Sequence, residues 1–341
     1  MRSWASAGIR QASCLWEGVV AASDLSLEAI VSLPSLTSAW GRVRENRGAA
    51  GGDGITIKRF EAMRDEHLVA LADDVLMGDY RPGPVRQVII RSPRKDRPIA
   101  LLCLRDRVLQ RAVLDAIGPH CERRFLPASY GYRAGLSLHD AVRRIVALRN
   151  RGKRIVIDAD IHRCFETLDH LMLTDAIAAM LPQRDPRLDW LIATWIAMRA
   201  ASPVTLRRRA HAPESRTHTR GILQGAPISP LLCNCALHQL DCAMARRRHA
   251  LVRYADDFVL LCGSLDEAEE AMGVLVDQLT AMWLRLSPAK TRITDFDRGF
   301  SFLGIQFQGD ETIVDVDGKH ISTETLPWRW LKHAPTGYDD C

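Results

Sequence analysis

The sequence predicts an α+β fold in which helices back an antiparallel sheet. Two observations support this prediction. The expected elements follow the order strand, helix, long helix, strand, tight turn, strand, helix and strand, instead of the regular alternation that builds a doubly wound parallel sheet. Two apolar runs, 251–254 and 258–262, are separated only by a tight turn, as in an antiparallel hairpin. With 341 residues, 47% of them hydrophobic, the chain is long enough for two globular units or for one large unit with a smaller companion.

The N-terminal half is expected to be mainly helical. Residues 1–25 show little patterning and predict a loosely attached leader or a single helix. The glycine-rich stretch 48–54 predicts a loop. Alternating and β-branched residues predict a basic hairpin with strands 85–91 and 99–104. Apolar residues at helical spacing predict helices over 26–42 with a break at Pro34, 57–77, 106–117 and 137–148.

The C-terminal half supplies the rest of the sheet. A continuous apolar strand over 154–161 is interrupted only by Asp158 and Asp160, so these carboxylates lie at the exit of the strand. A basic hairpin or loop is expected over 204–220. Further helices are expected over 171–181, 188–200, 227–247 and 265–284, and two final strands over 300–307 and 312–316.

Basic residues are unevenly distributed along the chain. The net charge is only +5, yet nine Arg or Lys and two Asp fall within residues 81–111. Further basic groups lie at 143–154, 207–209 and 246–248. One such group is usually a solvated face, but four in one chain favour a surface that binds phosphates.

Cysteine spacing and hydropathy argue against a disulfide-rich, secreted or membrane-spanning protein. No pair among the nine cysteines has the two-residue spacing of zinc ribbons and redox motifs, which predicts reduced thiols instead of a disulfide framework. Arg2, Arg10 and Glu17 interrupt the apolar residues of the N-terminus, so a signal peptide is not expected. The longest apolar stretch, 188–201, is shorter than the roughly 20 residues that cross a bilayer. We therefore expect a cytoplasmic protein with no membrane partner.

Three aspartates indicate metal-dependent chemistry. Asp256 and Asp257 lie in the tight turn between two apolar strands, and Asp160 ends another strand. Phosphoryl transfer from a nucleotide uses two divalent ions about 3.5–4 Å apart, and Mg²⁺ prefers oxygen ligands. An isolated Asp-Asp pair is usually only a polar β-turn. The Asp-Asp pair alone therefore does not distinguish a metal site from a polar turn, and the distinction depends on the flanking sequence.

The motif Tyr254-Ala255-Asp256-Asp257-Phe258 resembles the signature turn of reverse transcriptases, particularly those of group II introns and their prokaryotic relatives. Other segments resemble further blocks of this family, in the family's order, over residues 51–307. They are Val88–Gln110, Phe125–Ser137, Asp158–Ile161 with Cys164, Phe165 and His170, Gly221–Pro230, Lys290, and Phe302–Ile305. Such an ordered series is not expected by chance.

The resemblance implies a right-hand polymerase fold, with an antiparallel palm sheet backed by helices and with fingers. Only 34 residues follow Phe307, so a truncated or absent thumb is expected. A stand-alone enzyme of a CRISPR-linked or defence-related branch fits this length better than a mobile-intron protein. The expected domains are an N-terminal leader (1–25), fingers (26–150), a palm (151–308, with contributions from 100–150) and a C-terminal tail that could begin a thumb (309–341).

By resemblance, the chain is expected to be an RNA-directed DNA polymerase that extends a primer 3′-hydroxyl with dNTPs by two-metal phosphoryl transfer. Two Mg²⁺ ions are the implied cofactors, and Mn²⁺ could substitute for them. Asp160 is favoured over Asp158 as a ligand because the family places an aromatic gate five residues further on, at Phe165. The implied catalytic residues and metal ligands are Asp160, Asp256 and Asp257, with the backbone carbonyl of Ile161 as a further metal ligand.

The resemblance also implies a set of nucleotide contacts. Phe165, which would otherwise be a core aromatic, is expected to exclude a ribose 2′-hydroxyl and to favour deoxynucleotides. Gly225 has no side chain and would allow a base or a backbone to approach closely. Lys290 would act near the leaving pyrophosphate as a cation or general acid. The expected nucleotide-binding residues are Arg94, Lys95, Arg97, Phe165, Gln224, Gly225 and Lys290.

The expected partners are an RNA template, a DNA or RNA primer and dNTPs. A protein partner that supplies a thumb or a targeting function is also expected. Backbone-contacting arginines imply no base specificity. The expected nucleic-acid-binding residues are Arg133, Tyr254, Arg207, Arg208 and Arg209.

Three other functions stay open from the sequence. An RNA-directed RNA polymerase would share the palm and the metal chemistry, although the bulky Phe165 and the alanine at Ala255 favour DNA synthesis. A catalytically weak nucleic-acid-binding subunit of a CRISPR or defence complex would be indicated by a missing metal carboxylate, and all three are present. A metal-dependent nuclease is the third alternative.

Overall fold

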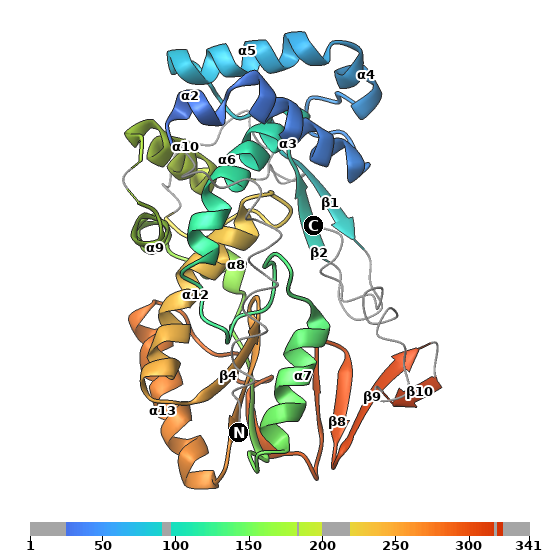
Figure 1. The fold of residues 1–341 in the computed structure, drawn as a ribbon, viewed down its shortest axis with the longest axis vertical. Helices are drawn as coiled ribbons and strands as arrows, with labels where there is room; N and C mark the ends of the chain where they lie inside the picture. Colours follow the sequence, from blue (N-terminus) through green and yellow to red (C-terminus); the bar gives the residue numbers. More distant parts are fainter. Residues whose placement is uncertain (1–24, 91–96, 183, 200–218, 317–318, 323–341) are drawn as a thin grey trace, which may run out of the picture. The chain divides into compact units, whose positions relative to one another are not determined.

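The computed structural model describes residues 25–90, 97–182, 184–199, 219–316 and 319–322 (Figure 1). They fall into two compact units. We call the one drawn from residues 16–123 and 168–232 the helical unit, and the one drawn from residues 124–167 and 233–340 the sheet unit. Each contains both helices and strands, which confirms the predicted α+β composition. The predicted leader up to residue 24, most of the predicted loop 204–220 and residues 323–341 lie outside the described residues.

The helical unit differs from the sequence prediction at two helix breaks. The first break falls at Val31–Ser32, and Pro34 lies in the first turn of the following helix, where a missing N–H is tolerated. The helix predicted over 57–77 is two helices, because Met63 leaves the helical conformation with φ −130° and ψ 34°. The helices of this unit are α2 (Leu27–Ile30), α3 (Leu33–Glu45), α4 (Ile57–Ala62), α5 (Arg64–Met77), α6 (Leu104–Glu122), α9 (His170–Met180) and α10 (Pro186–Ala197).

The predicted basic hairpin is confirmed in the helical unit. Strands β1 (Arg86–Ile90) and β2 (Arg97–Leu101) are antiparallel, and Ile90 is paired with Arg97. The second strand ends at Leu101 and not at the predicted Leu104, because Leu104 already begins α6. The turn between the strands, which includes Arg94 and Lys95, lies outside the described residues.

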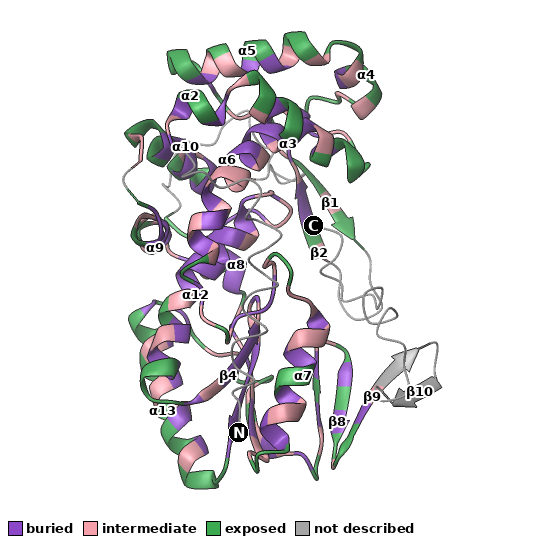
Figure 2. Cartoon of the chain, viewed as in Figure 1, coloured by how far each residue is buried: buried purple, intermediate pink, exposed green. Residues whose placement is uncertain are grey.

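The main sheet of the sheet unit has the strand order β4–β5–β3–β6, with every neighbouring pair antiparallel. Strands β3, β4 and β5 are buried or half-buried along their length (Figure 2 shows β4), whereas β6 begins at the exposed Arg292. Successive side chains of a strand point to opposite faces. Val156, Val252 and Val259 pack in one core cluster with α7 (Leu138–Arg149). The strands are β3 (Ile155–Asp160), β4 (Ala250–Tyr254), β5 (Asp257–Cys262) and β6 (Arg292–Asp295), and the further helices that supply residues to this unit are α8 (Cys164–Thr167), α12 (Ser229–Arg246) and α13 (Leu265–Ala281).

A second antiparallel sheet follows, in the order β10–β9–β8–β7. The prediction of one strand over 300–307 is wrong, because Leu303 (φ 53°) and Gly304 (φ 79°) form a turn within it. Two-residue hairpin turns favour positive φ at both positions, which glycine adopts without steric cost. The strands are β7 (Phe300–Phe302), β8 (Ile305–Gln308), β9 (Glu311–Val316) and β10 (Lys319–Ser322), and the sequence did not predict β6, β10 or α8.

A helix that crosses a bilayer needs about 20 consecutive apolar residues. Within the described ranges, no helix is both long enough and apolar enough to span a membrane.

Candidate active site on the β3, β4 and β5 strands

The antiparallel pairing of β3 with β5 brings two predicted metal ligands together. Asp160, the last residue of β3, is the register partner of Asp257, the first residue of β5. Directly opposed residues of an antiparallel pair point to the same face, with Cβ atoms about 4.5–5.5 Å apart. Two carboxylates distant in sequence therefore share one edge of the sheet.

The third predicted ligand, Asp256, lies in the turn between β4 and β5. Tyr254 pairs with Asp257, which leaves Ala255 and Asp256 as a two-residue turn. Ala255 is fully buried and has φ 58°, a left-handed conformation that costs a non-glycine residue about 1–2 kcal/mol. Strain of this kind persists only where surrounding contacts hold it, and it is frequent at functional sites.

Lys290 is positioned at the same edge by the segment that precedes β6. The Ser287 amide donates to the Asp160 carbonyl at 2.8 Å, and the His162 amide donates to the Arg285 carbonyl at 2.9 Å. These two hydrogen bonds hold residues 285–287 alongside the end of β3. Lys290 Nζ then lies 3.1 Å from Asp160 Oδ2. Asp160 and Lys290, each predicted separately as a site residue, are therefore in direct contact.

Asp158, the alternative to Asp160, has a different partner. It is the register partner of Arg292 on β6, and its carboxylate lies 3.2 Å from the Arg292 guanidinium. Burial raises the pKa of Asp158, and the nearby charges of Asp257 and Asp160 act in the same direction against the effect of Arg292. An arginine thus neutralises Asp158, whereas Asp160 faces Asp257 and Lys290.

Sequence reasoning missed a buried ion pair directly before the turn. Arg253 on β4 and Asp241 on α12 are both fully buried, with Arg253 Nη2 and Asp241 Oδ2 2.6 Å apart. Burial alone would lower the pKa of Arg253, but the charge of Asp241 outweighs it and the net shift is upward. The available signal was a charged residue within the apolar run 251–254 and two polar residues, Asn234 and Asp241, seven apart on an apolar helix.

Two further predicted residues follow β3. Phe165 lies on α8 and is 8% exposed, so its ring is largely buried. Ile161 is buried and forms an isolated bridge with Leu286, made through the backbone groups of Asp160 and His162. Neither arrangement tests the predicted contacts to nucleotide and metal, which stay predictions.

Arg97, Gln224 and Gly225 belong to the helical unit. The Ala100 amide on β2 donates to the Gln224 carbonyl at 2.7 Å. Gly225 has φ 98°, and a Cβ atom there would lie 2.6 Å from the Ala100 carbonyl oxygen and 2.6 Å from Ile99 Cγ2. The close approach that Gly225 was expected to allow is thus made by the backbone of β2.

Arg133 has contacts within its own loop. Its Nη1 donates to the carbonyls of Leu126 and Ser129, at 2.8 Å each, and its guanidinium lies 5.4 Å from the centre of the Phe125 ring. Tyr254 ends β4 and is partly buried. Arg207, Arg208 and Arg209 lie outside the described residues.

The donor chemistry of the site fits Mg²⁺. Asp160, Asp256 and Asp257 offer carboxylate oxygens, the ligand type that hard divalent cations prefer. Within the described ranges, no three His, Cys, Asp or Glu side chains are grouped closely enough to hold a metal ion in their present positions. The Asp160 carboxylate is instead paired with the ammonium group of Lys290.

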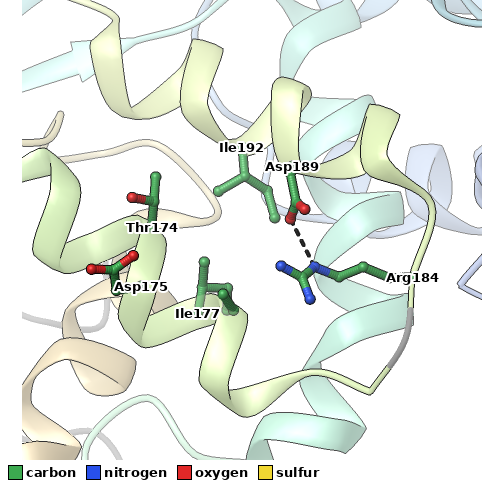
Figure 3. A pocket seen from close by; sticks show the side chains of 7 residues that line it. Thr174, Asp175, Ile177, Arg184, Asp189 and Ile192 are labelled. Atoms are coloured by element: carbon green, nitrogen blue, oxygen red, sulfur yellow. Dashed lines mark hydrogen bonds and ion pairs between the residues drawn. The ribbon is translucent and has the colours of Figure 1, made fainter.

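A cavity of about 220 Å³ lies elsewhere, in the helical unit between α9 and α10 (Figure 3). Arg184 and Asp189 form an ion pair of 2.7 Å at its wall. Its lining contains none of the sequence-predicted site residues; the lining residues are Thr174, Asp175, Ile177, Ala178, Arg184, Asp189 and Ile192.

Comparison with known proteins places the chain in a family. Residues 89–307 match the family described as reverse transcriptase (RNA-dependent DNA polymerase). Protein YkfC of Escherichia coli (strain K12) is 33% identical over 298 residues, which cover 74% of this chain and 74% of YkfC. The group II intron-encoded protein LtrA of Lactococcus lactis subsp. cremoris is 27% identical over 207 residues, which cover 60% of this chain but only 32% of LtrA.

Similar solved structures include a partial Cas6-RT-Cas1–Cas2 complex, with a TM-score of 0.44 and 24% identity, covering 75% of this chain and 41% of that chain. A truncated apo telomerase from Candida tropicalis has a TM-score of 0.47 and 13% identity, covering 66% of this chain and 54% of that chain. The family match covers more than half of the chain, and YkfC is 33% identical across about three quarters of it. The chain therefore belongs to the reverse transcriptase family, in the group II intron-like prokaryotic group that the sequence motifs predicted.

Proposed function

We propose that the chain is an RNA-directed DNA polymerase that extends a primer 3′-hydroxyl with dNTPs. The observation that carries this proposal is the pairing of Asp160 with Asp257 across β3 and β5, next to Asp256 in the turn, within a chain of the reverse transcriptase family. The right-hand arrangement of palm, fingers and thumb, with the predicted domain limits, is part of the same proposal.

Asp160, Asp256 and Asp257 would hold two Mg²⁺ ions, with the Ile161 carbonyl as a further ligand. When bound, such ions lower the pKa of the attacking hydroxyl and stabilise the oxygen that leaves. The opposed carboxylates of Asp160 and Asp257 concentrate negative charge on one face of the sheet, which favours a divalent cation at that edge. Mn²⁺ is expected to substitute for Mg²⁺, because it accepts the same oxygen ligands.

Lys290 is proposed to assist the departure of pyrophosphate. Its ammonium group is held at the site by the contact of 3.1 Å with Asp160 Oδ2. A lysine there offers both a positive charge and a proton on Nζ, and each stabilises an oxygen that gains negative charge. Phe165 is proposed to exclude a ribose 2′-hydroxyl by the bulk of its ring.

Other residues are proposed to bind the substrates. Nucleotide contacts are assigned to Arg97, with Arg94 and Lys95, and to Gln224 and Gly225. The RNA template and the DNA or RNA primer are assigned to Arg133, Tyr254 and the arginines 207–209. A protein partner within a CRISPR-linked or other defence complex completes the proposal, on the basis of the sequence resemblance alone.

The test is incorporation of dTTP on oligo(dT)-primed poly(rA) in the presence of Mg²⁺. The wild-type protein is compared with the double variant Asp256→Ala, Asp257→Ala. A matched control is Asp277→Ala, which removes an exposed carboxylate from α13 in the same unit. We expect incorporation by the wild type and by the control, and none by the double variant.

Parallel reactions separate the alternative functions. Equal incorporation of UTP in place of dTTP would favour an RNA polymerase. Cleavage of labelled template without nucleotides would indicate a nuclease. A folded wild-type protein that binds primer–template but incorporates nothing would contradict the polymerase proposal and favour a binding subunit.

A further inference from the structure

Arg253 lies two residues before the acidic turn and is enclosed by hydrogen-bond acceptors. Its Nε donates to Asp241 Oδ1 at 2.7 Å, and its Nη2 donates to Asp241 Oδ2 at 2.6 Å. Its Nη1 donates to Asn234 Oδ1 at 2.8 Å and to the carbonyl of Ala255 at 2.9 Å. An arginine has five N–H donors in a fixed planar fork, and four of these directions are used here.

Two of these partners lie on one face of α12. Asn234 and Asp241 are separated by seven residues, which is close to two helical turns, and both are buried. Asn234 continues the network, because its Nδ2 donates to the Gly131 carbonyl at 2.8 Å. The loop around residue 131 is therefore tied to α12 and, through Arg253, to the turn.

The same loop packs directly on the turn. The Arg253 amide donates to the Ala128 carbonyl and the Tyr130 amide donates to the Arg253 carbonyl, at 2.8 Å each. A Cβ atom at Gly131 would lie 2.5 Å from the Ala255 amide nitrogen, so only glycine permits this contact. The strained Ala255 is thus held by backbone packing on one side and by the Arg253 guanidinium at its carbonyl.

The bond from Arg253 to the Ala255 carbonyl has a direct effect on the site. A carbonyl oxygen and the next N–H belong to one rigid peptide plane. Fixing the Ala255 carbonyl therefore fixes the direction in which the chain enters Asp256, one residue before Asp257. Through this peptide, Arg253 bears on the position of both carboxylates.

We propose that Arg253 is a positioning residue that, with Asp241 and Asn234, holds the Ala255–Asp256 peptide so that the Asp256 and Asp257 carboxylates are preorganised for divalent metal. The metal part of this inference rests on the proposed function. A buried ion pair is by itself weak evidence for a stabilising role, because well-packed apolar residues of similar volume often replace one without loss. The buried pair of Arg253 and Asp241 is explained better by the bonds from Arg253 Nη1 to Asn234 Oδ1 and to the Ala255 carbonyl, which only the arginine fork provides.

The decisive variant replaces both charges together, as Arg253→Met with Asp241→Leu, so that no unpaired charge is left buried. Arg253→Lys is the second variant, because it keeps the charge beside Asp241 but lacks the planar fork. Ile145→Ala is the control, since it truncates a fully buried core residue of α7 in the same unit, and an apolar side chain makes none of the hydrogen bonds of the network. Denaturant unfolding ranks the stabilities of all three.

Two readouts are taken on the full chain. Hydrogen exchange of the peptide covering residues 252–258 reports the turn, and titration with Mn²⁺ alone, followed by electron paramagnetic resonance, reports metal binding. We expect about tenfold faster exchange of the turn and about tenfold weaker Mn²⁺ binding in the double variant. Arg253→Lys should change the exchange rate and the Mn²⁺ affinity in the same directions but by smaller factors. Ile145→Ala should change neither the exchange rate of the turn nor the Mn²⁺ affinity.

Unchanged turn exchange in both Arg253 variants, or equal acceleration in Ile145→Ala, would overturn the positioning role. The positioning role would also be overturned if Arg253→Met with Asp241→Leu made the turn exchange faster but left Mn²⁺ binding unchanged. The variant Asp256→Ala, Asp257→Ala separates the two proposals: if it binds Mn²⁺ as the wild type does, the metal site of the proposed function is wrong, whereas the exchange data still decide whether Arg253 holds the turn.

Discussion

Asp160 and Asp257 are directly opposed across the antiparallel pair of β3 and β5, so two negative charges share one face of the sheet. Like charges in this position destabilise a strand pair by about 0.2–1 kcal/mol. We therefore expect Asp257→Asn to raise the free energy of unfolding by up to about 1 kcal/mol. If Asp257 is a metal ligand, incorporation should fall at least about 100-fold, which corresponds to about 3 kcal/mol.

Urea unfolding and dTTP incorporation measure these two effects on the same preparation. Asp277→Asn, an exposed carboxylate on α13, should change neither quantity. An Asp257→Asn variant with wild-type incorporation would remove Asp257 from the proposed set of ligands.

Lys290 offers a second test, because its contact with Asp160 is exposed to solvent. An exposed ion pair contributes at most about 1 kcal/mol, so Lys290→Met should barely change stability. A proton donor contributes about 10²–10⁴-fold to a rate. We expect Lys290→Met to lower kcat by about 100-fold with little change in KM for dTTP, and Lys290→Arg to recover at most about tenfold, because arginine keeps the charge but does not release its proton.

Steady-state primer extension at varied dTTP concentrations measures both parameters. Arg298→Met removes another exposed ion pair of the sheet unit and serves as the control. Full recovery in Lys290→Arg would show that charge alone is needed and would contradict proton donation.

Phe165→Val tests the choice between deoxynucleotides and ribonucleotides. In an apolar pocket, a difference of about one methylene group changes the discrimination between two substrates by about 10–200-fold. We expect the ratio of UTP to dTTP incorporation to rise at least about tenfold. Phe302→Val, at another buried phenylalanine of the same unit, should lower stability comparably without changing the ratio, and a rise in both variants would count against a gate at Phe165.

Gly225→Ala probes the contact between residue 225 and β2. The new Cβ atom would lie 2.6 Å from the Ala100 carbonyl oxygen, and φ 98° is unfavourable for alanine. We expect a loss of roughly 2–4 kcal/mol in the free energy of unfolding. Gly41→Ala is the matched control, because its Cβ would meet no atom within 4 Å in α3, and it should stabilise by about 0.5–1 kcal/mol. Equal stability of the two variants would contradict this close contact.

The pH dependence of stability is expected to depend on Asp185, which caps α10. The Arg187 side chain, followed by the backbone amides of Arg187 and Leu27, lowers the pKa of Asp185 to about 2. A lowered pKa contributes stability above the ordinary value of 3.8, and this contribution is lost as pH falls toward 2. Asp185→Asn keeps a capping side chain, so it isolates the charge.

After allowance for solvent screening of Arg187, we expect Asp185→Asn to cost about 1 kcal/mol at pH 6. The difference from the wild type should fall to roughly half by pH 3. Denaturant unfolding at both pH values measures it. A difference that stays constant with pH would show that the charge of Asp185 does not contribute.

Several elements were predictable because their signals are local. The hairpin of β4 and β5 follows from two apolar runs around one turn, and the basic hairpin of β1 and β2 follows in the same way. The break at Met63 was not predictable, because the apolar spacing of 57–77 continues across it. The turn at Leu303–Gly304 had only one weak local signal, a single glycine within an apolar run.

The sequence by itself determined the mixed composition of helices and strands, the tight turn that carries Asp256 and Asp257, and the membership of the reverse transcriptase family. These depend on residue types that are adjacent or regularly spaced, so they can be read along one segment. The tertiary structure alone decided that Asp160 faces Asp257, that Lys290 reaches Asp160, and that Arg253 is buried against Asp241. Strand register and the pairing of buried charges depend on contacts between segments that are distant in sequence. The physical reason is that burying a polar group costs free energy unless it is hydrogen-bonded or paired, and its partner comes from another segment of the packed core.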